Sequence, residues 1–193
     1  MKVFILVGTS GAGKTSVLDR INLPSVNPVK LHSMLKPTNH FNLSNKLMLA
    51  KWNYIADWYN TILSLYRNGV SVVISDRTPL EVAGYVNNGH FILDAIKQTN
   101  SELNSLQDLN ENGELKDKIT LYFIYLHTDP QEMFYRKEKR KLNHNNKTWD
   151  ESERFFMETH KFYQENIELW HPIENITLEE TVSEVEKFIL NNI

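Results

Sequence analysis

Apolar residues gather in short runs along the chain, and stretches with helical spacing separate the runs. The clearest runs extend from Val3 to Val7, from Val70 to Ser75 and from Ile119 to Leu126. A weaker run covers Val29 to Leu31, and a short one lies near Asn175 to Thr177. Unbroken apolar runs of this length are typical of strands buried on both faces, and intervening helices make such strands parallel. The pattern predicts an α/β fold with helices on both sides of a parallel sheet.

Helical spacing of apolar residues predicts helices over Lys14 to Ile21, over Lys46 to Arg67 and after Leu178. Thr148 and Glu151 form a capping-box pattern that predicts a further helix start. The segment from 98 to 118 is rich in Asn, Gln and Glu. We expect this segment to be a surface insertion or an irregular loop.

Length and composition restrict the class of protein. The 193 residues suit a single domain over 1–193, and no apolar run approaches the roughly 20 residues that a membrane span needs. The formal charge of −3, without a basic tail, disfavours a nucleic-acid partner. The absence of cysteine excludes disulfides and suits a reducing cytosol, and the seven histidines lack zinc-site spacing. We therefore expect a cytoplasmic protein without a membrane partner or structural zinc.

A glycine-rich turn follows the first apolar run. The segment Gly8-Thr-Ser-Gly-Ala-Gly-Lys-Thr15 fits G-x-x-x-x-G-K-[ST] between a strand and a helix. Its glycines let backbone N–H groups point inward at the positive end of the helix, where a polyphosphate binds. Lys14 would reach the outer phosphates and the Thr15 hydroxyl would ligate Mg²⁺, so the turn predicts ATP and Mg²⁺ as cofactors. A chance match at a strand-to-helix turn is the alternative. The residues expected to hold the nucleotide are Gly8, Thr9, Ser10, Gly11, Ala12, Gly13, Lys14, Thr15 and Ser16.

A carboxylate at the end of another central strand is expected to hold the water shell of the metal ion. Asp76 is the candidate, because it follows the run that ends at Ser75. The alternative is that Asp76 simply caps the segment after the strand. A GTPase switch is disfavoured, because Asn146-Lys-Thr-Trp-Asp150 places the acid one residue too far for a guanine-reading element.

Asp129 and Pro130 follow the run that ends at Leu126 and predict a helix start. Arg136 and Arg140 lie four residues apart on this helix and could clamp a transferring phosphoryl group. The polar residues that follow suggest a closing lid over 136–149. The alternative is a solvated basic helix face.

Together these motifs resemble the nucleoside and nucleoside-monophosphate kinases, most closely the thymidylate kinases and the related deoxynucleoside kinases. The resemblance covers nearly the whole chain. It rests on the phosphate loop, Asp76-Arg77 with Gly84-Tyr85, Asp129-Pro130 with Arg136 and Arg140, and Phe155-Phe156 with Tyr163.

The resemblance implies a P-loop three-layer fold with a five-stranded parallel sheet, for which we expect the order 2-3-1-4-5, and a small lid. It also implies that Arg77 touches the acceptor and that Arg136 and Arg140 belong to the lid. The chain departs from the family's pattern at Leu35-Lys36-Pro37 and at Asp57-Trp58. A homodimer is a further expectation from the resemblance.

The acceptor is less defined. A phosphate acceptor is already ionised and benefits from cations, so Lys36 and Arg77 favour a monophosphate, whereas a hydroxyl acceptor benefits from a base such as Asp76. Aromatic residues on the long helix, including Trp52, could stack on a base, although such stripes are more often core. The resemblance gives Tyr85 a better position for this role.

We therefore expect an enzyme that transfers the γ-phosphoryl group of MgATP to a nucleotide or nucleoside, with a deoxynucleoside monophosphate such as dTMP as the first candidate. The alternatives are a deoxynucleoside kinase, a kinase of another small metabolite or of DNA, and a non-catalytic nucleotide-binding module. The expected catalytic residues are Lys14, Asp76, Arg77, Arg136 and Arg140, the expected metal ligands are Thr15 and Asp76, and the expected acceptor-binding residues are Lys36, Trp52, Arg77 and Tyr85.

Overall fold

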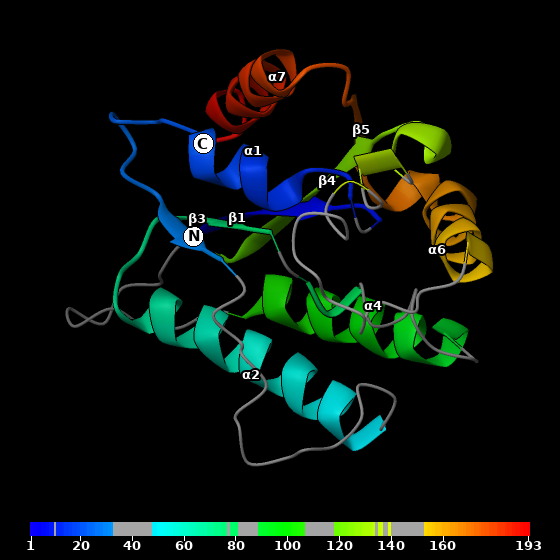
Figure 1. Ribbon diagram of the computed structural model, residues 1–193. Helices are drawn as coiled ribbons and strands as arrows, with labels where there is room; N and C mark the ends of the chain where they lie inside the picture. Colours follow the sequence, from blue (N-terminus) through cyan, green and yellow to red (C-terminus); the bar gives the residue numbers. More distant parts are fainter. Residues whose placement is uncertain are drawn as a thin grey trace. The chain divides into compact units, whose positions relative to one another are not determined.

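The computed structural model describes residues 1–9, 11–32, 48–76, 78–80, 89–106, 118–133, 135, 136, 139 and 153–193. These residues form a five-stranded sheet in the order β2-β3-β1-β4-β5. The pairs β1 with β3, β2 with β3 and β4 with β5 run parallel. The predicted α/β fold is confirmed (Figure 1), and the predicted strand order is confirmed by the strand pairing.

The strands are β1 (Lys2–Val7), β2 (Val29–Leu31), β3 (Val72–Ser75), β4 (Thr120–His127) and β5 (His171–Glu174). Four of them match the predicted runs to within two residues. The strand predicted at 175–177 is wrong, because β5 ends at Glu174. β5 carries one buried side chain, Ile173, and includes Pro172, so it shows no apolar run. Proline is tolerated there because β5 lies at the edge of the sheet.

The helices are α1 (Lys14–Arg20), α2 (Met48–Arg67), α4 (Gly89–Ser105), α6 (Glu153–Glu165) and α7 (Leu178–Leu190), with a short 3₁₀ helix at Ile167–Leu169. α2 ends as predicted before Gly69, which has a left-handed φ of 76°. The capping-box pair at 148 and 151 lies outside the described residues.

The prediction of irregular structure from residue 98 onward is wrong as far as Ser105, because α4 continues through this segment. Its buried residues Leu93, Ile96 and Leu103 recur at helical spacing. Gln98 donates a hydrogen bond to Glu102 one turn later, at 3.1 Å. The polar composition of this segment obscured its few apolar residues at helical spacing. Packing of such a face stabilises a helix even where the local sequence is polar. Residues 107–117 lie outside the described part of the chain.

Contacts divide the chain into two compact units, which are described separately. The first comprises Met1–Ile5 and Leu23–Tyr122, and the second comprises Leu6–Asn22 and Phe123–Ile193. The single-domain assignment stays a prediction.

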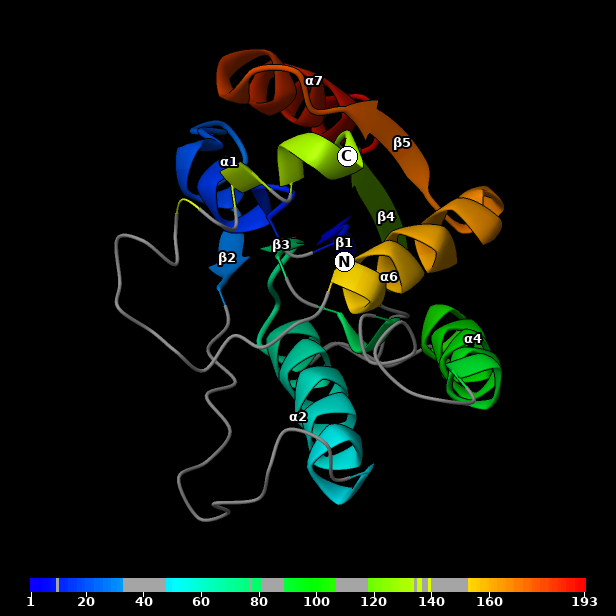
Figure 2. The same ribbon diagram turned by 45° about the vertical axis from the view of Figure 1, so that its right-hand side comes forward.

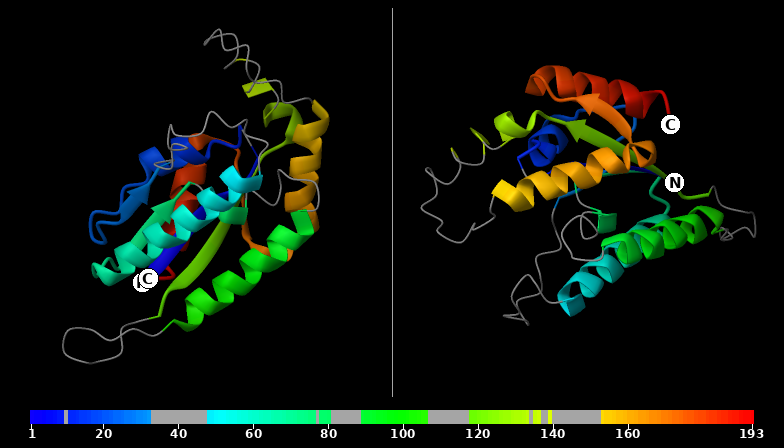
Figure 3. Two further views of the ribbon diagram at one scale, coloured as in Figure 1. Left: turned by 90° about the horizontal axis from the view of Figure 1, so that it is seen from below. Right: turned by 90° about the vertical axis from the view of Figure 1, so that its right-hand side faces the viewer.

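In the first unit, α2 and α4 lie side by side (Figures 1 and 3). Tyr59 on α2 donates a hydrogen bond to Asn100 on α4 at 2.7 Å, and burial raises the pKa of Tyr59 above its usual range. Trp58 and Ile62 are almost completely buried. The aromatic side chains Trp58 and Tyr59 therefore belong to the core.

In the second unit, helices cover both faces of β4 and β5. α6 lies on one face, where Tyr125 of β4 stacks on Tyr163 with ring centroids 5.3 Å apart (Figures 2 and 3). α7 covers the other face, where His171 of β5 stacks on Phe188 at 4.3 Å. α1 packs against α7. None of the described helices combines the length and apolar character that crossing a membrane would require.

Candidate phosphate-binding site

The glycine-rich turn forms a curled loop between β1 and α1. Gly11 and Gly13 have left-handed φ angles of 90° and 82°, which residues with a side chain adopt only at a cost. Gly13 is the N-cap of α1 and offers no side chain to its first turn. The N–H groups at this helix start are therefore suited to an anion, as the sequence motif predicts.

Lys14 folds back over this loop. Its Nζ donates hydrogen bonds to the carbonyl oxygens of Gly8 at 2.6 Å and Thr9 at 3.2 Å, and the residue is only 8% exposed. Thr15, one residue later, is exposed at the first turn of α1. A lysine held over the loop can exchange carbonyl contacts for phosphate oxygens, which is the chemistry that the motif requires.

Behind the loop lies the helical segment that follows β4. The Thr9 hydroxyl donates a hydrogen bond to the sulfur of Met133, a fully buried residue. A Cβ atom at Gly11 would come within 3.1 Å of the Met133 carbonyl oxygen. The absence of a side chain at Gly11 thus permits a close approach between the loop and this segment.

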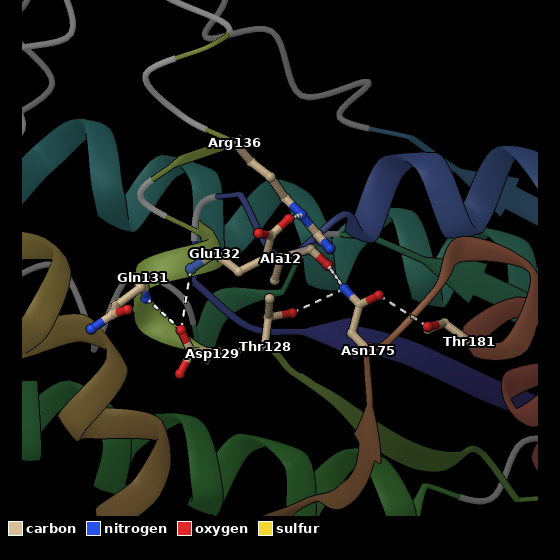
Figure 4. A network of polar contacts seen from close by, with 8 residues as sticks. All are labelled: Ala12, Thr128, Asp129, Gln131, Glu132, Arg136, Asn175 and Thr181. Carbon is tan, nitrogen blue, oxygen red and sulfur yellow. Dashed lines mark hydrogen bonds and ion pairs between the residues drawn. The ribbon is translucent and has the colours of Figure 1, made fainter.

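Asn175 also contacts the loop. It directly follows β5 and is 8% exposed. Its Nδ2 donates hydrogen bonds to the Ala12 carbonyl oxygen and, at 3.0 Å, to the Thr128 hydroxyl (Figure 4). The Thr181 hydroxyl of α7 lies 2.9 Å from its Oδ1 and 2.6 Å from the Thr177 carbonyl oxygen, so its single hydrogen is shared between these two acceptors (Figure 4). The sequence interpretation missed these three polar residues, because it placed Asn175 inside a strand. The signal was available: polar residues directly after parallel strands commonly line ligand sites.

The predicted helix start at Asp129 is confirmed. Oδ1 of Asp129 accepts hydrogen bonds from the backbone N–H groups of Gln131 at 2.8 Å and Glu132 at 3.2 Å, and residues 130–133 are helical. Arg136 pairs with Glu132 through Nε at 2.7 Å (Figure 4). The Arg136 guanidinium thus pairs with a carboxylate one helical turn earlier in the same segment. Its proposed role in clamping a transferring phosphoryl group stays a prediction.

A polar cluster lies where β4 and β5 end. Nδ1 of His127 lies 2.8 Å from the carboxylate of Glu174, its partner in the strand register. The His160 ring from α6 stacks on His127 with centroids 5.9 Å apart. Burial is the main cause that lowers the pKa of His160, and His127 lowers it further, whereas Asp129 acts in the opposite direction. These surroundings therefore favour the neutral form of the His160 ring.

Asp76 belongs to the first unit. It follows β3 directly, is 1% exposed, and its backbone N–H donates to the Leu31 carbonyl oxygen at 3.3 Å. Removing a carboxylate from water is costly, so a buried acid at the carboxyl end of a central strand is a candidate for function. Its magnesium role together with Thr15 stays a prediction.

Several predicted residues lie outside the described part of the chain: Ser10, Lys36, Arg77, Tyr85, Arg140 and the lid residues 137, 138 and 141–149. Trp52 lies on α2 and is 37% exposed, which leaves part of its ring accessible. Its role in binding a base stays a prediction.

The sheet order and the loop between β1 and α1 match a P-loop kinase fold. No family model matches the chain, and no curated protein matches it in sequence. Among solved structures, it is similar to a deoxyadenosine kinase from M. mycoides with the products dCMP and a flexible dCDP bound. That match covers the full length of both chains with a TM-score of 0.62 and 17% identity.

A second structure of that deoxyadenosine kinase, with bound dATP, matches 99% of this chain and 97% of its own, with a TM-score of 0.55 and 16% identity. The structure of the Pnkp1/Rnl/Hen1 RNA repair complex contains a chain that matches over 88% of this chain and 46% of its own, with a TM-score of 0.57 and 14% identity. At these identities the matches establish the shared fold.

Proposed function

We propose that this protein is an ATP-dependent kinase that phosphorylates a deoxynucleoside or a deoxynucleoside monophosphate. The observation that carries the proposal is the loop between β1 and α1, in which Lys14 folds over the backbone in front of a glycine N-cap. This arrangement suits the triphosphate of ATP. The similarity to one deoxyadenosine kinase over the full chain supports the acceptor class.

Each residue has a role in this proposal. The loop amides and Lys14 bind the donor phosphates, and Arg136 with Arg140 stabilises the charge that develops on the transferred group. The oxygen ligands expected for Mg²⁺ are the Thr15 hydroxyl and the Asp76 carboxylate, a donor set that suits this hard cation. When bound, Mg²⁺ neutralises charge on the β- and γ-phosphates.

Different observations favour two classes of acceptor for the phosphoryl group. The buried Asp76 and the match to deoxyadenosine kinases favour a deoxynucleoside, whose hydroxyl needs a base. The cations Lys36 and Arg77 favour a monophosphate such as dTMP, with Tyr85 or Trp52 stacking on the base. In the first case Asp76 accepts the proton of the hydroxyl, and in the second no base is needed.

The test is incubation with MgATP and a panel of nucleosides, deoxynucleosides and their monophosphates, with the products identified by mass spectrometry. We expect a phosphorylated deoxynucleoside or deoxynucleoside diphosphate, formed together with ADP. Lys14→Ala should lower turnover roughly 100-fold or more, because it removes a charge that stabilises the transferring group.

Lys161→Ala is the matched control, because Lys161 is exposed on α6 and pairs at 3.5 Å with Glu165 one turn later. It should leave turnover unchanged. Full phosphotransfer by Lys14→Ala would refute the assignment of the loop. ATP binding without acceptor-dependent ADP formation would instead favour the non-catalytic binding module.

A further inference from the structure

The contacts of Asn175 account for every hydrogen-bonding group of its amide. Nδ2 has two hydrogens, and these reach the Ala12 carbonyl oxygen and the Thr128 hydroxyl. Oδ1 accepts from Thr181, and the backbone N–H donates to the His127 carbonyl oxygen at 2.8 Å. The amide is therefore held in one orientation by β4, β5 and α7, with its donor side facing the phosphate loop (Figure 4).

The Ala12 carbonyl belongs to the same peptide group as the Gly13 N–H. In a planar trans peptide these two groups point in opposite directions, and the described residues contain no cis peptide. Nδ2 of Asn175 also lies 3.5 Å from the position of a Cβ atom on Gly13. A carbonyl held on Asn175 thus directs the Gly13 N–H away from Asn175, toward the other side of the loop.

We infer that Asn175 is a positioning residue that orients the Ala12–Gly13 peptide so that its N–H donates to a phosphate of the bound nucleoside triphosphate. The inference rests on the proposed function and adds to it a residue far from the loop in sequence. Gly13 has no side chain to restrict its backbone, so an external hydrogen bond is needed to select one of the two peptide orientations. Thr181 supports this role by fixing the amide from the opposite side.

The substitution that tests this is Asn175→Asp, which keeps the shape of the side chain. Thr128 can turn its hydroxyl to donate to the new oxygen, and Thr181 still donates to the other one. The Ala12 carbonyl can only accept, so this contact is lost and becomes repulsive, and the carboxylate also adds a negative charge beside the loop. Losing one charge-assisted hydrogen bond to phosphate should raise the KM for ATP about 10- to 100-fold.

The matched control is Asn166→Asp. Nδ2 of Asn166 donates to the Phe162 carbonyl oxygen at 2.8 Å, so the same kind of bond is lost at the end of α6. In Asn175→Asp we expect a raised KM for ATP, an unchanged KM for the acceptor and a weaker shift of the Gly13 amide resonance on adding MgATP. In Asn166→Asp all three should remain as in the wild type.

An unchanged KM for ATP in a folded Asn175→Asp variant, with normal activity of the wild type, would overturn this inference alone. Failure of the wild-type protein to bind MgATP would overturn the proposed function and this inference with it. If Asn175→Asp does not fold, Thr181→Val keeps the side-chain volume and removes the hydroxyl that Oδ1 shares with the Thr177 carbonyl oxygen. It should raise the KM for ATP about 3- to 10-fold, and an unchanged value would refute the positioning role.

Discussion

At the scale of single residues, the glycines differ in what their missing side chains make room for. Gly11 and Gly69 both have left-handed φ angles, of 90° and 76°. A Cβ atom at Gly11 would lie 3.1 Å from the Met133 carbonyl oxygen, whereas one at Gly69 would meet no described atom within 4 Å. The first glycine is required by conformation and by space, and the second by conformation alone.

This difference predicts two outcomes for the same substitution. Gly69→Ala should lower the free energy of unfolding by about 1–2 kcal/mol, the cost of a left-handed residue, and leave ATP affinity unchanged. Gly11→Ala should lose at least as much stability and also weaken ATP binding, because the loop must move away from Met133. Urea unfolding and ATP titration of both variants measure these effects. Equal ATP affinity in the two variants would contradict the prediction.

His160 predicts a pH dependence of stability. Its folded pKa is lowered from the ordinary value of 6.5, so the unfolded chain binds a proton more tightly than the folded one. Stability should therefore fall as the pH drops below 6.5, until the folded form also takes up the proton. His160→Gln should reduce this dependence when urea unfolding is measured at several pH values in that window. An unchanged slope would contradict the assignment of this pH dependence to His160.

At the scale of elements, the boundary between β5 and α7 shows how a local cap specifies a helix start. Thr177 is the N-cap of α7, and its hydroxyl accepts from the Glu180 N–H at 3.3 Å. Glu179 and Glu180 place negative charge in the first turn, and Lys187 places positive charge in the last. Both charges interact favourably with the helix dipole and thereby stabilise the helix.

Thr177→Ala should therefore lower the free energy of unfolding by about 1 kcal/mol, the usual cost of losing an N-cap. The control is Thr61→Ala on α2, where the hydroxyl donates to the Asp57 carbonyl oxygen one turn earlier, at 2.8 Å. Such a bond within a helix adds little stability, so the change should stay within about 0.5 kcal/mol. Urea unfolding compares the two, and equal losses would argue against the cap.

At the scale of the whole molecule, burial separates β1 and β3 from the two edge strands of the sheet. β1 and β3 are apolar along nearly their whole length and lie inside the sheet, whereas β2 has one buried residue and β5 one. Strands inside a parallel sheet are covered on both faces, but edge strands are not. The central strands could therefore be predicted from their apolar runs. The edge strand β2 keeps a short apolar pattern at Val29–Leu31, whereas β5 includes Pro172 and shows no apolar run, so β5 was misplaced.

The sequence by itself determined the elements whose causes are local. The glycine turn, the start of the helix after Asp129 and the end of α2 before Gly69 depend on residues within a few positions of one another, so a motif or cap predicts them. The central apolar runs likewise predicted a parallel sheet.

Only the tertiary structure decided which distant residues meet. Asn175, Thr128 and Thr181 come from the ends of two strands and from a helix, and they surround a carbonyl of a loop more than 100 residues earlier in the chain. No periodicity or short motif encodes such a meeting, because it depends on strand order and on the way α7 returns to the sheet. The residues that we propose to bind the phosphates could therefore be predicted from the sequence, and those that support the loop could not.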